Sequence, residues 1–171
     1  MALTTQPRRV QFVQTIGLVA APVVHGQEKA AQTYKAGAFL QDDDAGRITE
    51  SASPIDASGV TKRTFGMALA GASGVTDKDV PIVWAGAYTV FEGTLSDATA
   101  GTHALAQADM YKVYPITKGT ANWYLDANAV SDGGGGVVVG LKDPIGTVDG
   151  RVYFIVTNTA RGGANVASGT F

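Results

Sequence analysis

The chain has 171 residues, of which 16% are charged and 22 are glycine, and its formal net charge is −2. Lys and Arg are scattered rather than clustered, so a partner bound through a basic surface, such as nucleic acid, is not expected. Cys is absent, which excludes a disulfide framework and a Cys-based metal site. Soluble domains average about 25% charged residues. The low charge therefore favours burial of part of the surface against other subunits, although a β protein rich in tight turns has a similar composition.

Residues 1–33 are predicted to form an extended N-terminal arm. Arg8 and Arg9 precede an apolar stretch that ends at Val24, an order also seen in signal peptides. Three polar residues between positions 11 and 15 interrupt the stretch, and no clean cleavage site follows it. The stretch is shorter than the ~20 residues needed to span a bilayer, so no membrane partner is expected. Residues 27–32 favour helix by composition and could add one or two helical turns.

Residues 34–159 are predicted to form the folded body, followed by a C-terminal tail at 160–171. Short apolar runs alternate with Gly-bearing turns, which is typical of a sandwich or a closed barrel. We therefore predict an all-β fold, a small β-barrel or jelly-roll-like sandwich with an extended N-terminal arm and little helix. The predicted strands lie at 34–40, 47–50, 64–70, 80–84, 88–95, 110–114, 122–126, 137–141 and 151–156.

Several connections are also predicted from residue type. Residues 42–46 and 117–120 are expected to be hairpin turns, because Asp and Gly tolerate the backbone angles of tight turns. Pro81 is expected at a strand entrance or on an edge strand. Residues 133–136 are expected to form a flexible loop, and residues 104–109 a short helix or a loop.

Few side chains suit catalysis or metal binding. Asp42, Asp43 and Asp44 are consecutive, whereas a calcium loop spaces its ligands at alternate positions, so a solvated turn is favoured over a metal site. Neither His25 nor His103 lies in a known catalytic or zinc motif, and an exposed or locally bonded imidazole is favoured for both. We expect no enzymatic activity, no metal and no cofactor.

The aromatic residues allow two interpretations. They could form a sugar-binding platform, or they could be core and interface residues, which is the commoner role in a small β domain. The phosphate-binding and nucleophile-elbow motifs are both absent from the glycine-rich segments. The aromatic residues concerned are Trp84, Trp123, Tyr111, Tyr114 and Tyr124.

Two segments resemble the capsid decoration proteins of tailed phages, also called structural cement proteins. The first comprises residues 64–70 with 79–86. The second, residues 138–154, contains the run Asp-Pro-Ile-Gly-Thr-Val-Asp-Gly-Arg-Val and is the more specific match. The resemblance covers roughly residues 34–157. The usual Gly-Asp before the third block is Ala108-Asp109 here, which affects the tightness of that turn.

The resemblance implies a non-enzymatic virion protein, made in the host cytoplasm and placed on the capsid exterior. It would bind the major capsid protein and cement neighbouring subunits, as a homo-oligomer with a trimer favoured. The alternative is a carbohydrate- or receptor-binding β module of a phage fibre or tail. A disordered tail is the alternative to a binding role for the arm. The candidate contacts with the capsid or a sister subunit are Arg8 and Arg9, as partners of carboxylates, and Phe12, Val13, Ile16 and Leu18, as apolar anchors.

Overall fold

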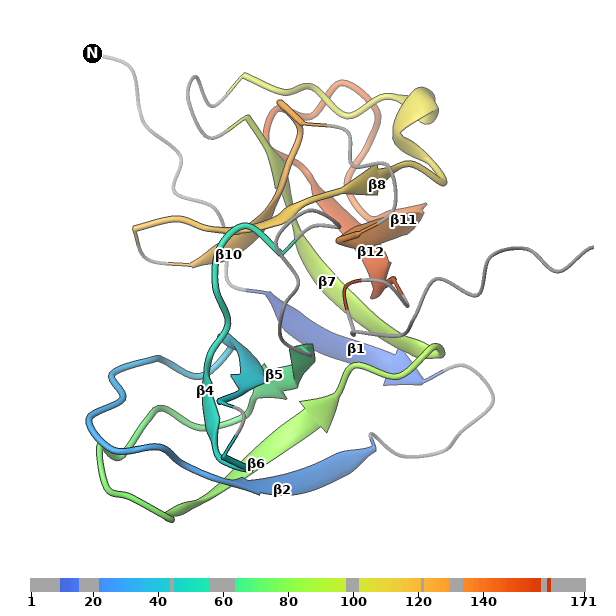
Figure 1. Cartoon of the computed structure of the whole chain (residues 1–171). Helices are drawn as coiled ribbons and strands as arrows, with labels where there is room; N and C mark the ends of the chain where they lie inside the picture. Colours follow the sequence, from blue (N-terminus) through green and yellow to red (C-terminus); the bar gives the residue numbers. More distant parts are fainter. Residues whose placement is uncertain are drawn as a thin grey trace, which may run out of the picture.

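Figure 1 shows the computed structural model of the chain, which describes residues 10–15, 22–43, 45–55, 64–97, 102–120, 122–129, 134–157 and 160. The predicted all-β class is confirmed, because a nearly closed, barrel-like sheet packs with a second sheet. The only helix in these ranges is one 3₁₀ turn, η1 (Gln107–Asp109). The first sheet contains β1 (Gln11–Thr15), β7 (Thr89–Ser96), β8 (Val113–Tyr114), β9 (Ile116–Lys118), β10 (Trp123–Asp126), β11 (Gly136–Leu141) and β12 (Arg151–Val156). The second sheet contains β2 (Val23–Gln27), β3 (Phe39–Asp42), β4 (Ile48–Glu50), β5 (Thr64–Ala68) and β6 (Asp79–Trp84).

Strand β7 is the centre of the first sheet, whose order is β8-β11-β12-β7-β10-β9. Strand β12 runs antiparallel along one edge of β7. The opposite edge is shared by β1, which pairs antiparallel with residues 89–92, and β10, which pairs parallel with residues 95–96. All eight residues of β7 are buried, as expected for a strand that is covered on both edges and both faces.

The second sheet is antiparallel, with the order β2-β6-β5-β3-β4. Just after β2, Glu28 forms a parallel bridge with Ile48 of β4, and the Lys29 N–H donates to the Ile48 carbonyl at 3.0 Å. The first and last strands of the sheet therefore meet at one end. This sheet is a small barrel that is closed at residues 28–29 and not closed along β2.

Aromatic rings fill the space between the two sheets. Phe39 of β3 contacts Phe91 and Trp123 of the first sheet edge-on, at ring distances of 5.7 and 5.8 Å. Phe91 and Phe154 lie 5.8 Å apart, and all four side chains are nearly inaccessible to solvent. The sheets are also joined through Ile55 and Ile116, whose backbones exchange two hydrogen bonds. Burial of this aromatic and aliphatic surface is the main stabilising contribution.

The hairpins predicted around residues 42–46 and 117–120 are confirmed, whereas the loop predicted at 133–136 is wrong at Gly136. Strands β3 and β4 pair across residues 43–47, where Gly46 has a φ of 81°. Strands β9 and β10 pair across residues 119–122. The predicted strand at 151–156 matches β12. Residues 104–109 combine extended backbone with the short η1, and Gly136 is already the first residue of β11.

The N-terminal region differs from the expected arm. Strands β1 and β2 are extended, but they pair with β7 and β6 and are therefore part of the sheets. Residues 27–32 form no helix, because Gln27 ends β2 and Glu28 is buried, where its carboxylate accepts the backbone N–H groups of Ser73 and Gly74 at 2.9 and 2.6 Å.

The prediction for Pro81 is also wrong, since it lies inside β6, between β2 and β5. Its carbonyl accepts the Leu69 N–H at 3.0 Å, and the N–H and C=O of a strand residue point to the same edge. The missing N–H of Pro81 therefore faces Leu69, beyond the end of β5. Pro81 therefore cannot return a hydrogen bond to Leu69, but the residues that pair within β5 and β6 are not affected.

Candidate interaction surfaces

The segment that carries the phage resemblance forms the hairpin between β11 and β12. The Asp143 carboxylate accepts three hydrogen bonds from Arg151, at 2.9 Å from its backbone N–H, 3.0 Å from Nε and 2.7 Å from Nη2. A bidentate guanidinium–carboxylate pair fixes orientation as well as distance. The Asp and Arg of the motif therefore clamp the base of the loop at 144–150.

The same loop packs against residues 103–105. Leu105 donates its N–H to the Thr147 carbonyl at 3.0 Å and accepts the Gly146 N–H at 2.7 Å. The Leu105 side chain is buried, and a Cβ on Gly150 would lie only 2.4 Å from its Cδ1. A side chain at position 150 would therefore displace the buried Leu105. The loop leaves Ile145 and Val148 exposed, at 61% and 51% of their accessible area.

A hydrogen-bond network around Asp109 holds residues 103–106, which pack against this loop. The Asp109 carboxylate, only 3% exposed, accepts from the Tyr114 hydroxyl at 2.7 Å, the Ala106 N–H at 2.8 Å and His103 Nε2 at 3.1 Å. Burial opposes ionisation of Asp109, but these bonds outweigh it and hold its pKa below the usual value. Burial and the bond to Asp109 both raise the pKa of Tyr114, which keeps it a donor. His103 is thus locally bonded, as favoured from the sequence.

A second carboxylate, next to the Asp143–Arg151 pair, is neutralised by positive charges. Glu92 of β7 is buried and forms ion pairs with Lys142 and Arg151. Burial opposes its ionisation, but hydrogen bonds from Lys142 and Gln11 and the nearby positive charges hold the pKa of Glu92 below its usual value. The cluster connects β7 through charge with β12 and with Lys142, the residue after β11, and through the neutral Gln11 side chain with β1.

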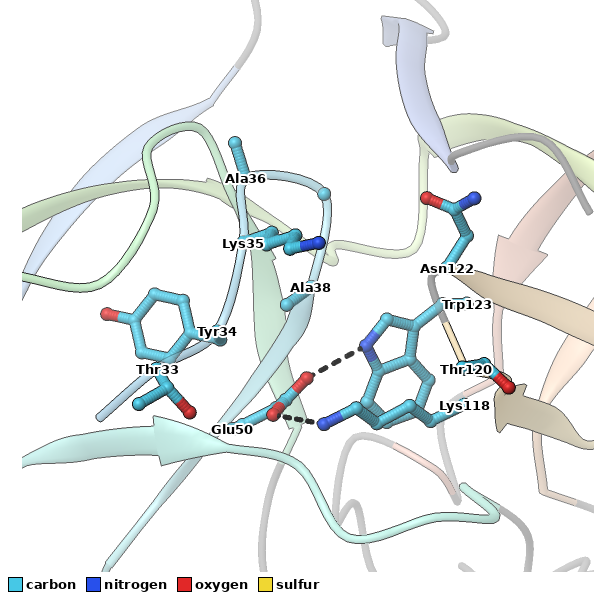
Figure 2. A pocket seen from close by; sticks show the side chains of 11 residues that line it. Thr33, Tyr34, Lys35, Ala36, Ala38, Glu50, Lys118, Thr120, Asn122 and Trp123 are labelled. Atoms are coloured by element: carbon cyan, nitrogen blue, oxygen red, sulfur yellow. Dashed lines mark hydrogen bonds and ion pairs between the residues drawn. The ribbon is translucent and has the colours of Figure 1, made fainter. Parts of the chain in front are cut away.

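A small pocket lies at the junction of the two sheets (Figure 2). Glu50 of β4 accepts from Lys118 Nζ at 2.6 Å and from the indole nitrogen of Trp123 at 3.3 Å, both from the first sheet. The pocket measures about 170 Å³, below the range of about 300–1,000 Å³ typical of small-molecule sites. Its polar groups hold the sheets together. The lining residues are Thr33, Tyr34, Lys35, Ala36, Gly37, Ala38, Glu50, Lys118, Thr120, Asn122 and Trp123.

A larger groove of about 250 Å³ follows the open side of the second sheet, and we call it the seam. Two of its aromatic residues, Phe65 and Trp84, contact each other at a ring distance of 5.6 Å, and Trp84 is 39% exposed. Sequence reasoning missed the seam, because β2 was assigned to an arm. The apolar pair Val23–Val24 was the available signal. The seam is lined by Val24, His25, Gly26, Asp42, Gly46, Ile48, Phe65, Ile82 and Trp84.

The predicted contact residues are only partly described. Phe12 is half-buried against the protein's own core and lies opposite Phe91, whereas Val13 is 37% exposed. Phe12 therefore contributes to the body in this structure, and Val13 remains accessible. Arg8, Arg9, Ile16 and Leu18 lie outside the described residues.

The aromatic residues separate into core and surface. Tyr114, Trp123 and Tyr124 are each at most 3% exposed, which confirms the core interpretation for these three. Trp84 and Tyr111 are exposed, but Trp84 ends β6 in the second sheet and Tyr111 follows η1. The five do not form one sugar-binding row.

The remaining polar candidates are local contacts. His25 Nδ1 lies 2.5 Å from Asp79 Oδ2 on the surface of β2 and β6. The Asp43 carboxylate accepts the N–H groups of Ala45 and Arg47 and so closes the β3–β4 turn, while Asp44 lies outside the described residues. Within the described ranges, no three His, Asp or Glu side chains are arranged to hold a metal ion.

The comparisons with known proteins identify no relative. No protein family, curated protein or solved structure matches the chain. None of the helical residues in the described ranges forms a segment long and apolar enough to cross a membrane. A functional proposal therefore depends on the motif resemblance and on the surfaces described above.

Proposed function

We propose that this chain is a phage virion structural protein that binds the outer surface of the assembled head and cements neighbouring major capsid protein subunits. The observation that carries the proposal is the hairpin at 142–151. Its motif residues Asp143, Gly150 and Arg151 each have a specific role in holding a loop. That loop presents two apolar side chains, Ile145 and Val148, on the surface.

The physical role follows from linkage. A protein that binds only the assembled shell adds its binding free energy to the stability of the shell. Several weak contacts suffice when one oligomer engages several subunits, because each contact raises the effective concentration for the next. The low charge content of 16% fits a surface that is largely covered in the assembly. The protein would act on the capsid exterior as a homo-oligomer, for which a trimer is favoured.

The N-terminal contacts remain part of the proposal. Arg8 and Arg9 would pair with carboxylates of the coat protein or of a sister subunit, and Ile16 and Leu18 would supply apolar anchors. Val13 is accessible for the same purpose. Phe12 is not included, because it packs against the core of its own chain.

The test compares heads of the phage that encodes this chain, prepared with and without it. We expect cryo-electron microscopy to show added density at regular positions on the outer surface, and heads without the chain to break at lower temperature. The double substitution of Ile145 and Val148 by Asp should reduce occupancy. Val75→Asp, at a site 60% exposed in the second sheet's 69–78 connection, should not. Heads that carry no density and resist heat equally well would refute the proposal.

The alternative function is a carbohydrate- or receptor-binding module. The observation that favours it is the Phe65–Trp84 pair in the apolar seam, since a partly exposed aromatic ring can stack on a sugar. A glycan array distinguishes the two functions. Binding that is lost in Trp84→Ala, together with no affinity for heads, would select the alternative.

A further inference from the structure

The seam has one wall with unused backbone hydrogen-bonding groups. The Trp84 N–H donates to the Pro22 carbonyl at 2.9 Å. The Glu28 N–H donates at 2.8 Å to the carbonyl of Lys78, the residue before β6. Because alternate residues of a strand face opposite edges, the even-numbered residues of β2 bond to β6. The N–H and C=O groups of Val23 and His25 therefore point away from β6, into the seam.

Among the described residues, this edge lacks the features that usually protect an edge strand. Such strands are shielded by Lys, by Pro, by a bulge or by a covering loop. Strand β2 pairs with β6 in an unbroken register and contains neither Lys nor Pro. Val23 and Val24 are 44% and 38% exposed beside it. An apolar, unshielded edge of this kind is expected to be paired in the working state of the protein.

The shape of the seam limits what can pair with β2. The opposite wall is the β3–β4 hairpin, with Asp42, Gly46 and Ile48, and the groove ends where Glu28 meets Ile48. A strand added to β2 would therefore lie between β2 and this hairpin. The β2 strand of a second copy does not fit, because it carries its own β6 on the far side.

Charge indicates which segment is complementary. The chain has no Asp or Glu before Glu28, and Arg8 and Arg9 lie immediately before Val10. The hairpin wall carries Asp42, while Asp43 of the same hairpin is used in the turn and lies 3.8 Å from Lys29; Arg47 is paired with Asp77. Residues 1–9 combine these two arginines with Leu3 and β-branched threonines, which suit an added strand. Pro7 lies among them and fits an added strand when its missing N–H faces away from β2.

The position of Val10 sets how far this segment can reach. Val10 is fully buried in the first sheet, where it lies against β7. Nine residues extend at most about 30 Å from that point. That length is enough to reach the second sheet of a neighbouring molecule.

We propose that residues 1–9 of one copy add as a strand to β2 in the seam of a second copy, with Arg8 and Arg9 beside the acidic β3–β4 hairpin. Main-chain hydrogen bonds to Val23 and His25 supply affinity, and the apolar groove supplies specificity. Such a contact is head-to-tail, and head-to-tail contacts form a ring when the rotation between copies closes and an open filament when it does not. The inference concerns contacts between copies and does not depend on binding to a head.

The first experiment compares the full chain with a variant lacking residues 1–9, by light scattering coupled to size exclusion. We expect the full chain to be an oligomer and the truncated chain to be a folded monomer with an unchanged β-sheet circular dichroism spectrum. An oligomer of the same mass after truncation would overturn the proposal, and so would a monomeric full chain.

The second experiment adds a labelled synthetic peptide of residues 1–9 to the truncated chain and follows fluorescence anisotropy. Saturable binding is expected, weakened by salt because the arginines contribute. Val24→Lys should weaken it about tenfold or more, while the matched control Val75→Lys, on an exposed Val outside the seam, should leave it unchanged. Absence of saturation, or equal loss in both variants, would refute the seam as the site.

Discussion

Replacing Asp109 by Ala should destabilise the fold strongly, although the residue belongs to a short 3₁₀ turn near the surface. The substitution removes the acceptor for three groups: the Tyr114 hydroxyl, the Ala106 N–H and His103 Nε2. Tyr114 is 2% exposed, so its hydroxyl cannot simply turn to water. The effect should extend to the loop at 144–150, because Leu105 and His103 both bond to it.

The expected size follows from the cost of unsatisfied polar groups. A buried donor left without a partner costs about 1–3 kcal/mol. Two such donors, on Tyr114 and Ala106, give a loss of about 2–4 kcal/mol for Asp109→Ala, with the half-buried Ala106 near the lower limit. Tyr114→Phe removes one donor and leaves Asp109 with two partners, so it should cost about 1 kcal/mol.

Urea unfolding at several pH values measures these differences. The pKa of Asp109 is lower in the folded state than in the unfolded chain. Its contribution is therefore complete above the unfolded pKa of about 3.9 and is lost as the pH falls through the folded value. The difference in the free energy of unfolding between wild type and Asp109→Ala should be constant near neutral pH and should become smaller in the acid range. A loss below about 0.5 kcal/mol, or a gap that widens in acid, would refute this account.

Two further predictions test the packing. Gly66→Ala should prevent folding or lower the melting temperature sharply, because its Cβ would lie 2.0 Å from the Val83 carbonyl oxygen. Gly71→Ala should be nearly neutral, since its closest contact would be 3.5 Å, and equal effects of the two would contradict the β5–β6 packing. In acrylamide quenching, Trp84 should be accessible and Trp123 protected. Trp84→Phe should therefore remove most of the quenchable emission, and loss of only the protected fraction would be inconsistent with the fold.

Much of the fold could be predicted because strands and hairpins are encoded locally. The run at 151–156 matches β12, and the Asp/Gly turn at 42–46 joins β3 to β4 as expected. These features depend on neighbouring residues only. The turn role of the acidic run and the core role of most of the aromatic residues could be predicted for the same reason.

The pairing of distant strands could not be predicted in this way. Periodicity shows that a segment near Phe12 is extended, but not whether its partner belongs to the same chain or to another. Here β1 pairs with β7, and Gln14 lies opposite Val90, 76 residues later in the sequence. Glu92 is similar, because its partner Lys142 is 50 residues away in the sequence. The seam was missed because it exists only when β2 and β4 meet at Ile48.

The clamp between Asp143 and Arg151 has a consequence for comparing sequences. Two features of this run have a structural role in the hairpin: a carboxylate that pairs with a guanidinium, and a glycine that leaves room for the leucine packed against it. Proteins with different functions can share these residues because they share the same type of hairpin. Grouping proteins by this run would therefore group them by the structure of a hairpin. The two exposed side chains at its tip, Ile145 and Val148, would distinguish them by binding partner.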